Sequence, residues 1–324
     1  DGDGASYTEQ LTINVNDVQE NTPVRFDFNA DGVADILWRH PNGPNRIWLM
    51  NDDGTRDSIV NPGGFPATWD VAGVANFNDD GVADILWHNE NNGATRVWLM
   101  NDDGTRDSIV NPGGFPVTWD VAGVANFNDD GVADILWHNE NNGGTRVWLM
   151  NDDGTRDSIV NPGGFPVTWD VAGVANFNDD GVADILWHNE DNGATRVWLM
   201  NDDGTRDSIV NPGGFPVTWD VAGVANFNDD GVADILWHNE NNGGTRVWLM
   251  NDDGTRDSIV NPGGFPVTWD VAGVANFNDD GVADILWHNE NNGGTRVWLM
   301  NDDGTRDSIV DPGAFPVPWD IVGM

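Results

Sequence analysis

The sequence of 324 residues contains no cysteine. It therefore has no disulfide framework, no thiolate metal site and no thiol chemistry. Lysine is absent too: all 14 basic residues are arginine, against 54 acidic residues, and the formal net charge is −40. A charge of this sign disfavours nucleic acid and anionic membrane surfaces as partners. It is consistent with high solubility, salt tolerance or cation binding.

Long apolar runs and helical patterns are also missing. No run approaches the roughly 18 apolar residues that a membrane-spanning helix needs, so we expect no membrane insertion. No secretory leader is visible, and the opening "DGDGASYTEQ" suggests a fragment of a longer protein. No apolar stripe has the 3.6-residue spacing of a helix, so we expect a helix content near zero.

The chain does contain a repeat of 50 residues. The phrase "NFNDDGVADILW" at 76–87 returns unchanged at four later positions, and the near copy "DFNADGVADILW" occupies 27–38. The 18 tryptophans divide into six sets of three. Such identity indicates recent duplication, so the presence of a residue in every copy is not by itself evidence of a role.

Each period contains four predicted short strands. In the best-preserved units they correspond to 69–77, 83–89 and 95–101, with 55–61 as the fourth strand of the preceding unit. Asn-Gly and Asp-Gly pairs separate them, and these pairs favour tight hairpins because such turns need positive φ. The Asp-Asp-Gly turn at 52–54 is interpreted as a plain hairpin.

A four-stranded unit of about 50 residues is typical of a β-propeller blade. The first strand is small and apolar, as suits the strand nearest the axis, and the fourth is polar, as suits an exposed edge. A parallel β-helix is the alternative, but its coils are usually shorter and lack hairpin turns. The sequence therefore predicts an all-β, six-bladed propeller of near-identical four-stranded blades over residues 23–324.

The two ends of the repeat region complement each other. "WDIVGM" at 319–324 matches the first part of the innermost strand, and "VRFDF" at 24–28 matches its last part. We expect the ring to close by pairing of these N- and C-terminal pieces in one blade. Residues 1–22 lie outside the repeat, and 7–23 resembles the last strand and linker of a bacterial cadherin-like or immunoglobulin-like module.

The acidic loop after the first strand has a regular frame of oxygen-bearing residues. Asp27, Asn29, Asp31 and Asp35 occupy positions 1, 3, 5 and 9, with Gly32 at position 6. A hard divalent cation prefers about six to eight oxygen ligands. Alternate side chains can point inward, the glycine permits the sharp turn, and position 7 offers a carbonyl. The alternative is that Asn and Asp make only local turns with their own backbone.

The predicted metal ligands, five in each of six loops, are Asp27, Asn29, Asp31, Val33, Asp35, Asn76, Asn78, Asp80, Val82, Asp84, Asn126, Asn128, Asp130, Val132, Asp134, Asn176, Asn178, Asp180, Val182, Asp184, Asn226, Asn228, Asp230, Val232, Asp234, Asn276, Asn278, Asp280, Val282 and Asp284.

These loops resemble the calcium loops of FG-GAP/VCBS repeat propellers, the blade type also found in integrin α chains. That family carries D-x-[DN]-x-[DN]-G-x-x-D between the first two strands. "DFNADGVAD" at 27–35 matches fully, whereas "NFNDDGVAD" at 76–84 has Asn in place of Asp at position 1. The resemblance implies up to six structural Ca²⁺ ions, an extracellular location and a binding or adhesive role without enzyme activity. The Asn-led loops should bind calcium more weakly, because they have two carboxylates at the ligand positions instead of three if Asp79 points away.

Other candidate chemistry is less persuasive. One His per blade after the second-strand Trp (His40, His88 and equivalents) is interpreted as structural. Asp84 and Glu90 could be imagined as a glycosidase pair, but every blade offers the same set and none of the common hydrolase or nucleotide-binding motifs occurs.

The tryptophans divide into two kinds. Trp87 and Trp98 are expected to fill the space between blades. Trp69 follows Phe65 and Pro66 in the loop between blades and is the best candidate for an exposed sugar-stacking residue. The candidate ligand-binding residues are Trp69, Trp119, Trp169, Trp219, Trp269 and Trp319.

The combined prediction is a non-catalytic, calcium-binding interaction or adhesion module of an exported bacterial protein, located outside the cell or on its surface. It should be a monomer with a protein or glycan ligand, and without nucleic acid. The alternatives are a multivalent lectin, a recently amplified scaffold without a specific ligand and, least favoured, a polysaccharide-acting enzyme.

Overall fold

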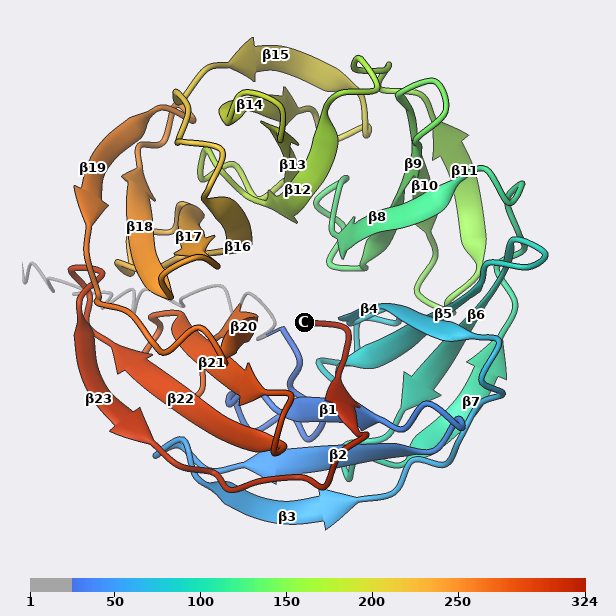
Figure 1. Ribbon diagram of the computed structural model, residues 1–324. Coiled ribbons are helices and arrows are strands. Elements are labelled where there is room, and N and C mark those ends of the chain that lie inside the picture. The colour runs from blue at the N-terminus through green and yellow to red at the C-terminus, as the bar shows by residue number, and fades with distance from the viewer. Residues whose placement is uncertain (1–24) are drawn as a thin grey trace, which may run out of the picture.

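The computed structural model describes residues 25–324 and contains six four-stranded antiparallel sheets arranged around a central axis (Figure 1). No helix occurs among these residues. This confirms the predicted all-β, six-bladed propeller. The segment 1–22, assigned to a preceding module, lies outside the described residues.

Each blade runs from an innermost strand beside the axis to an outermost strand at the rim. In that order, blade 1 contains β24 (Asp320–Ile321), β1 (Ile36–Arg39), β2 (Asn45–Met50) and β3 (Arg56–Val60). Blade 2 contains β4 (Asp70–Ala75), β5 (Asp84–Asn89), β6 (Ala94–Met100) and β7 (Arg106–Val110). Blade 3 contains β8 (Asp120–Ala125), β9 (Asp134–Asn139), β10 (Gly144–Met150) and β11 (Arg156–Val160). Blade 4 contains β12 (Asp170–Ala175), β13 (Asp184–Asn189), β14 (Ala194–Met200) and β15 (Arg206–Val210). Blade 5 contains β16 (Asp220–Ala225), β17 (Asp234–Asn239), β18 (Gly244–Met250) and β19 (Arg256–Val260). Blade 6 contains β20 (Asp270–Ala275), β21 (Asp284–Asn289), β22 (Gly294–Met300) and β23 (Arg306–Val310).

The hydrophobic core lies between blades. Phe77 and Leu86 of blade 2 pack in one cluster with Ile135 and Trp137 of blade 3, and the same arrangement recurs around the ring. The second strand of each blade is buried along its whole length, while the outermost strand alternates between half-buried and exposed positions. A blade therefore cannot bury its apolar faces alone, and neighbours must supply the missing surface.

The tryptophans of the second and third strands fill this core. Trp87 and Trp98 are completely buried, with ring centroids 4.8 Å apart. Phe65, from the loop that enters the blade, packs on both rings at 5.1 and 5.3 Å. The predicted structural role of these two tryptophans is confirmed.

The ring closes in blade 1, where the C-terminal strand β24 pairs with β1. Ile321 lies opposite Trp38, and the Val322 N–H donates to the Leu37 carbonyl at 3.0 Å. The last part of this inner strand comes from the other end of the chain, where the Asp35 N–H donates to the Phe26 carbonyl at 2.9 Å. The predicted closure by N- and C-terminal pieces is confirmed.

The inner strands of neighbouring blades approach closely around the axis. A Cβ atom added at Gly73 of β4 would lie 2.7 Å from a methyl group of Val124 in β8. Only glycine allows this contact without displacement, so the Val-Ala-Gly-Val sequence of the inner strands is a packing requirement of the ring.

Candidate functional site

The six acidic loops form a continuous ring. Each loop joins the innermost strand of a blade to the second strand, and its position-8 N–H donates to the position-1 carbonyl of the preceding blade. The Ala83 N–H donates to the Asp27 carbonyl at 2.7 Å, and the Ala34 N–H donates to the Asn276 carbonyl at 2.8 Å, which closes the circle. The conformation of one loop is therefore coupled to that of its neighbour by backbone contact.

In blade 1 the loop folds around the carboxylate of Asp27. Its Oδ1 accepts the N–H groups of Asn29 and Asp31 at 3.2 and 3.3 Å, and its Oδ2 accepts the Gly32 N–H at 2.9 Å. Asp31 Oδ1 accepts the Val33 N–H at 3.0 Å, and its Oδ2 accepts the Asn29 amide at 2.8 Å. Burial raises the pKa of Asp27, and the backbone N–H groups partly oppose this rise.

In blades 2–6 an asparagine replaces that first aspartate and makes fewer contacts. Asn76 Oδ1 accepts the Asn78 N–H at 3.2 Å, but its Nδ2 is buried without a hydrogen-bond partner among the described residues. Asp80 keeps the contacts of Asp31 with the amide of Asn78 and the Val82 N–H. The Asn-led loop thus has the same shape with one carboxylate less at its centre.

Position 9 is a buried carboxylate in every blade. Asp84 is completely buried; its Oδ2 accepts the Phe77 N–H at 2.9 Å and its Oδ1 accepts the Met100 N–H at 2.8 Å. It therefore joins the loop to the end of the third strand. Burial raises the pKa of Asp84 to about 8, although the two N–H groups oppose the rise and nearby Asp80 adds to it. Burial acts in the same direction on the pKa of Asp35 in blade 1.

Position 4 distinguishes the blades in a way that the ligand frame did not predict. Asp79 has a positive φ of 57°, and a Cβ atom added at Gly131 of the next blade would lie 2.9 Å from its Oδ1. The carboxylate of one blade thus overlies the loop of the next. Blade 1 has Ala30 at this position, and a Cβ added at Gly81 would meet nothing within 4 Å. The sequence feature that could have indicated this contact is the difference at position 4, where blade 1 has Ala30 and the other blades have Asp.

The donor set fits a hard cation. The predicted side chains at positions 1, 3 and 5 lie in each loop, whereas the position-9 aspartate, such as Asp84 at the start of β5, directs its two oxygens to backbone N–H groups. The Oδ1 atom of the position-3 asparagine, Asn29 in blade 1 and Asn78 in blade 2, is buried without a hydrogen-bond partner among the described residues. Within residues 25–324 no cluster of three or more His, Cys, Asp or Glu side chains has a metal-binding arrangement, so any site would depend on amide and backbone oxygens as well as carboxylates.

The predicted sugar-stacking tryptophans are half-buried. Trp69 packs on Phe65 with centroids 4.9 Å apart, and the guanidinium of Arg96 lies 5.4 Å from its ring centroid. In blade 6 the corresponding Trp269 and Arg296 line a cavity of about 290 Å³ together with Asn292 and Asp311. Arg296 and Asp311 form a salt bridge of 2.7 Å. This cavity, called the Trp269 groove below, therefore combines an aromatic edge with hydrogen-bonding groups.

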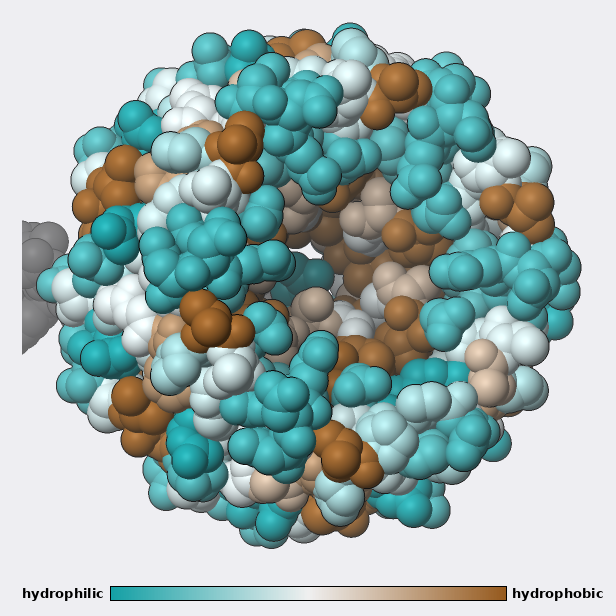
Figure 2. Space-filling model, viewed as in Figure 1, coloured by the Kyte–Doolittle hydropathy of each residue, from teal (hydrophilic) through white to brown (hydrophobic). Residues whose placement is uncertain are grey.

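Exposed apolar side chains accompany these tryptophans, and the repeat pattern alone did not identify them. Val117, two residues before Trp119, has a relative exposure of 54%, and its counterparts recur in the later blades. Ile109 on the outermost strand of blade 2 is also exposed. Figure 2 shows brown apolar patches separated by teal polar surface around the ring.

One sequence assignment is wrong in blade 1. His40 is not the counterpart of His88, because Arg39 stands opposite Asp320 in β24 as His88 stands opposite Asp70 in β4. His88 is buried and packs edge-on against Trp137 of the next blade at 5.3 Å. His40 lies two residues after Trp38, whereas His88 lies one residue after Trp87. For the five true counterparts, the predicted structural role agrees with this packing.

Comparison with known proteins gives a family match and a fold match. Residues 27–87 match the model of the FG-GAP-like repeat family. Among solved structures, the chain resembles a lectin from Agrocybe aegerita, described as specifically recognising non-reducing terminal N-acetylglucosamine (18% identity, 90% of this chain and 79% of that chain, TM-score 0.60). It also resembles a chain of the nidogen/laminin complex (12% identity, 86% of this chain and 93% of that chain, TM-score 0.50).

A putative 6-phosphogluconolactonase from Bacteroides uniformis is similar over 92% of this chain and 84% of that chain, with 15% identity and a TM-score of 0.49. No curated protein matches the chain. At these identities the matches to the lectin and to the nidogen/laminin chain support the propeller fold alone. None of the described elements is a helix with the length and apolar character to cross a membrane.

Proposed function

We propose that this propeller, whose residues 27–87 match the FG-GAP-like repeat, is a non-catalytic interaction and adhesion module of an exported bacterial protein. The observation that carries the proposal is repetition: near-identical blades present the same half-buried Trp with the same Arg above it around one ring, and five of the six tryptophans are accompanied by an exposed Val. Linked weak sites can gain about 10²–10⁴ in avidity when a partner is also repetitive.

Calcium is the structural cofactor in this proposal. Positions 1, 3, 5 and 9 and the position-7 carbonyl would hold it in each loop, from Asp27 and Asn29 in blade 1 to their counterparts in blade 6. A bound ion would neutralise carboxylates such as Asp84, whose burial otherwise disfavours ionisation. The orphaned amide oxygen of Asn29 supports this assignment. Titration calorimetry with calcium on EDTA-treated protein tests it; an absence of saturable heat would refute it.

The partner is proposed to be a protein or glycan on the outside of a cell, with the propeller acting as a monomer. A multivalent lectin is the second candidate. The Trp269 groove, with its arginine, asparagine and aspartate, favours this reading, because aromatic stacking combined with directed polar groups suits a sugar.

A glycan array distinguishes the two. The test protein carries Trp→Phe at all six candidate positions, which keeps an aromatic ring in the Phe65-type packing. The matched control carries Ile→Thr at the exposed outer-strand positions Ile59 and Ile109 and their counterparts. A lectin should bind selected glycans, lose them with the Trp variant and keep them with the control. Protein binding that is unaffected by the Trp variant would favour adhesion through other loop surfaces.

A further inference from the structure

The centre of the ring encloses a cavity that is distinct from the six repeated sites. It has a volume of about 390 Å³, and its wall consists mainly of Val, Ala and Gly residues from the inner strands. Figure 2 shows the hollow at the centre of the ring, with brown and pale walls inside a teal rim. Pockets that hold small molecules commonly measure about 300–1,000 Å³ and are mostly apolar, so this cavity has both the size and the lining of a ligand site.

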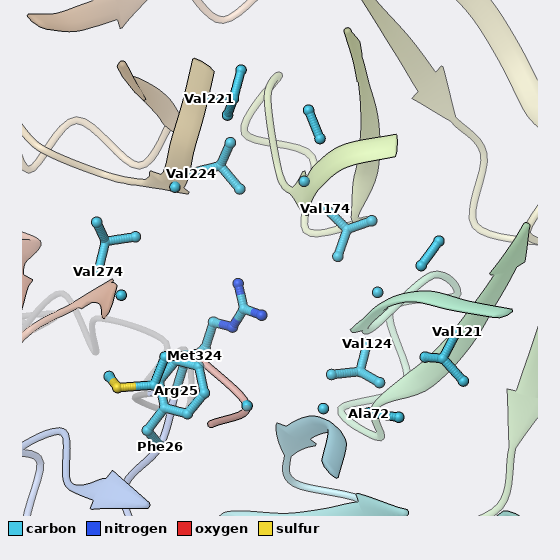
Figure 3. Close-up of a pocket in the computed structure, with 18 of the residues that line it drawn as sticks. Arg25, Phe26, Ala72, Val121, Val124, Val174, Val221, Val224, Val274 and Met324 are labelled. Carbon is cyan, nitrogen blue, oxygen red and sulfur yellow. The ribbon is translucent and has the colours of Figure 1, made fainter. Parts of the chain in front are cut away.

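The six-fold pattern of the wall is broken in blade 1. Blade 1 takes its inner strand from both chain ends: Met324 occupies the position that valine holds in the other five blades, and Arg25 and Phe26, from the other end of the repeat region, also line the cavity. Figure 3 shows the Arg25 side chain extending into the lumen among the labelled valines. Arg25 is the single charged residue among those that line the cavity.

Arg25 brings the one positive charge to the cavity wall. Its guanidinium forms no salt bridge with the described residues, within which the one such pair joins Arg296 and Asp311. The Arg25 side chain is exposed within the tunnel, and no carboxylate of the described residues pairs with its guanidinium. It is strongly predisposed to a planar oxyanion, with which it can form two parallel hydrogen bonds.

We propose that the tunnel binds one small monocarboxylate with an apolar body per ring. The carboxylate pairs with Arg25, and the apolar body lies against the Val and Ala side chains of β4, β8 and their counterparts. This function goes beyond surface adhesion and is independent of it, because it uses a single asymmetric site at the closure of the ring rather than the repeated loops and grooves.

Isothermal titration of the full chain with octanoate tests the proposal. We expect saturable binding with one site per chain, and no binding of octan-1-ol, which has a similar apolar body and no charge. Arg25→Gln should weaken octanoate binding at least about tenfold, because hydrogen bonds to charged groups contribute about 1.5–3 kcal/mol. The matched control is Arg106→Gln on the exposed outer strand, which should leave octanoate binding unchanged.

A second variant tests the location without altering charge. Ala72→Leu narrows the cavity from the wall that β4 contributes, and should weaken octanoate binding while thermal melting reports an intact fold. The proposal is overturned if the wild-type chain gives no saturable heat at millimolar octanoate, if octan-1-ol binds equally well, or if Arg25→Gln binds octanoate as the wild type does.

Discussion

The acidic loop of blade 1 and those of the other five blades carry the same number of carboxylates in different places. Blade 1 has Asp27, Asp31 and Asp35, whereas blade 2 has Asp79, Asp80 and Asp84. In blade 1 the first carboxylate gathers three backbone N–H groups at the loop centre. In blade 2 that charge has moved to position 4 and overlies the following blade.

The consequence is a graded series of loops around an otherwise repetitive ring. The loop of blade 1 has its own three carboxylates and receives Asp279, whose Oδ1 would lie 3.0 Å from a Cβ on Gly32. The loop of blade 2 has two at its own centre and receives only Ala30. Blades 3–6 are intermediate, with two of their own and one from the preceding blade. Near-identity of sequence thus leaves the loops unequal, because blade 1 differs at position 1 and blade 2 receives no carboxylate from the preceding blade.

Calcium should have the largest effect on stability, and it would act on every blade. At about ten times Kd each site adds about 1.4 kcal/mol, so six independent sites would add about 8 kcal/mol to the free energy of unfolding. Urea unfolding in excess EDTA and in millimolar calcium measures the difference. Coincident unfolding curves would contradict filled loops.

Removing the position-9 carboxylate should destabilise every blade by a similar amount, because blade 1 and the other five blades all have Asp at this position. Asp84→Ala leaves the buried N–H groups of Phe77 and Met100 without their acceptor, at a cost of about 2–3 kcal/mol. Asp35→Ala in blade 1 should cost a similar amount. Urea unfolding of both variants in EDTA checks this; a much smaller loss for either would mean that its N–H groups find other acceptors.

Alanine at the loop glycine separates the blades. Gly81 and Gly131 have almost equal φ values, 84° and 85°, so the backbone strain of about 1–2 kcal/mol should be the same. Gly131→Ala additionally meets the Asp79 carboxylate, whereas Gly81→Ala meets nothing within 4 Å. Gly131→Ala should therefore be the more destabilising by thermal melting, and Asp79→Ala should remove the excess. Equal melting temperatures would show that Asp79 moves aside freely.

Exchanging position 1 should make the loops more alike. Asn76→Asp restores an acceptor for the Gly81 N–H and adds a carboxylate, so its loop should bind calcium about tenfold more tightly, since ligand charge tunes such sites over decades. Asp27→Asn should weaken the loop of blade 1. Calorimetric titration that resolves one altered site per variant is the measurement, and unchanged isotherms would show that position 1 does not contact the ion.

The smallest expected effect is a pH dependence carried by five blades and absent from blade 1. Burial lowers the pKa of His88 below its usual 6.5, although Asp120, Glu90 and Asp70 partly oppose this. The unfolded chain therefore takes up the proton first, and stability present above about pH 6.5 is lost as the pH falls. Blade 1 has Arg39 at this position, so it contributes nothing to this pH dependence.

The control for this pH effect is a variant with Gln at the five histidines, compared with the wild type by urea unfolding between pH 7.5 and 5.5, a window chosen around the usual imidazole pKa of roughly 6.5. The difference between the two proteins is informative, because buried Asp84 and its counterparts change stability in the opposite sense over part of this range. Parallel pH profiles would contradict the assignment. The histidines concerned are His88, His138, His188, His238 and His288.

The sequence by itself determined the blade. Asn-Gly and Asp-Gly turns, the small apolar inner strand and the spacing of the tryptophans identify four local strands, and the matching fragments at 24–28 and 319–324 identify the closure. These are local or pairwise signals, because turn geometry and strand alternation depend on neighbouring residues. The same local reasoning predicted Asp27 and Asn29 as ligands, and it misassigned His40 because it matched the residue type and not the distance from Trp38.

Only the tertiary structure decided what lies between blades and on the axis. Asp79 overlies the loop of the next blade. Trp69 is half-buried against Phe65 and Arg96, and Arg25 enters a cavity that all six blades build. A repeat unit contains no record of which of its side chains a neighbour will meet. Those contacts are fixed when the ring closes, because its curvature sets the distance between surfaces that are about 50 residues or more apart in the chain.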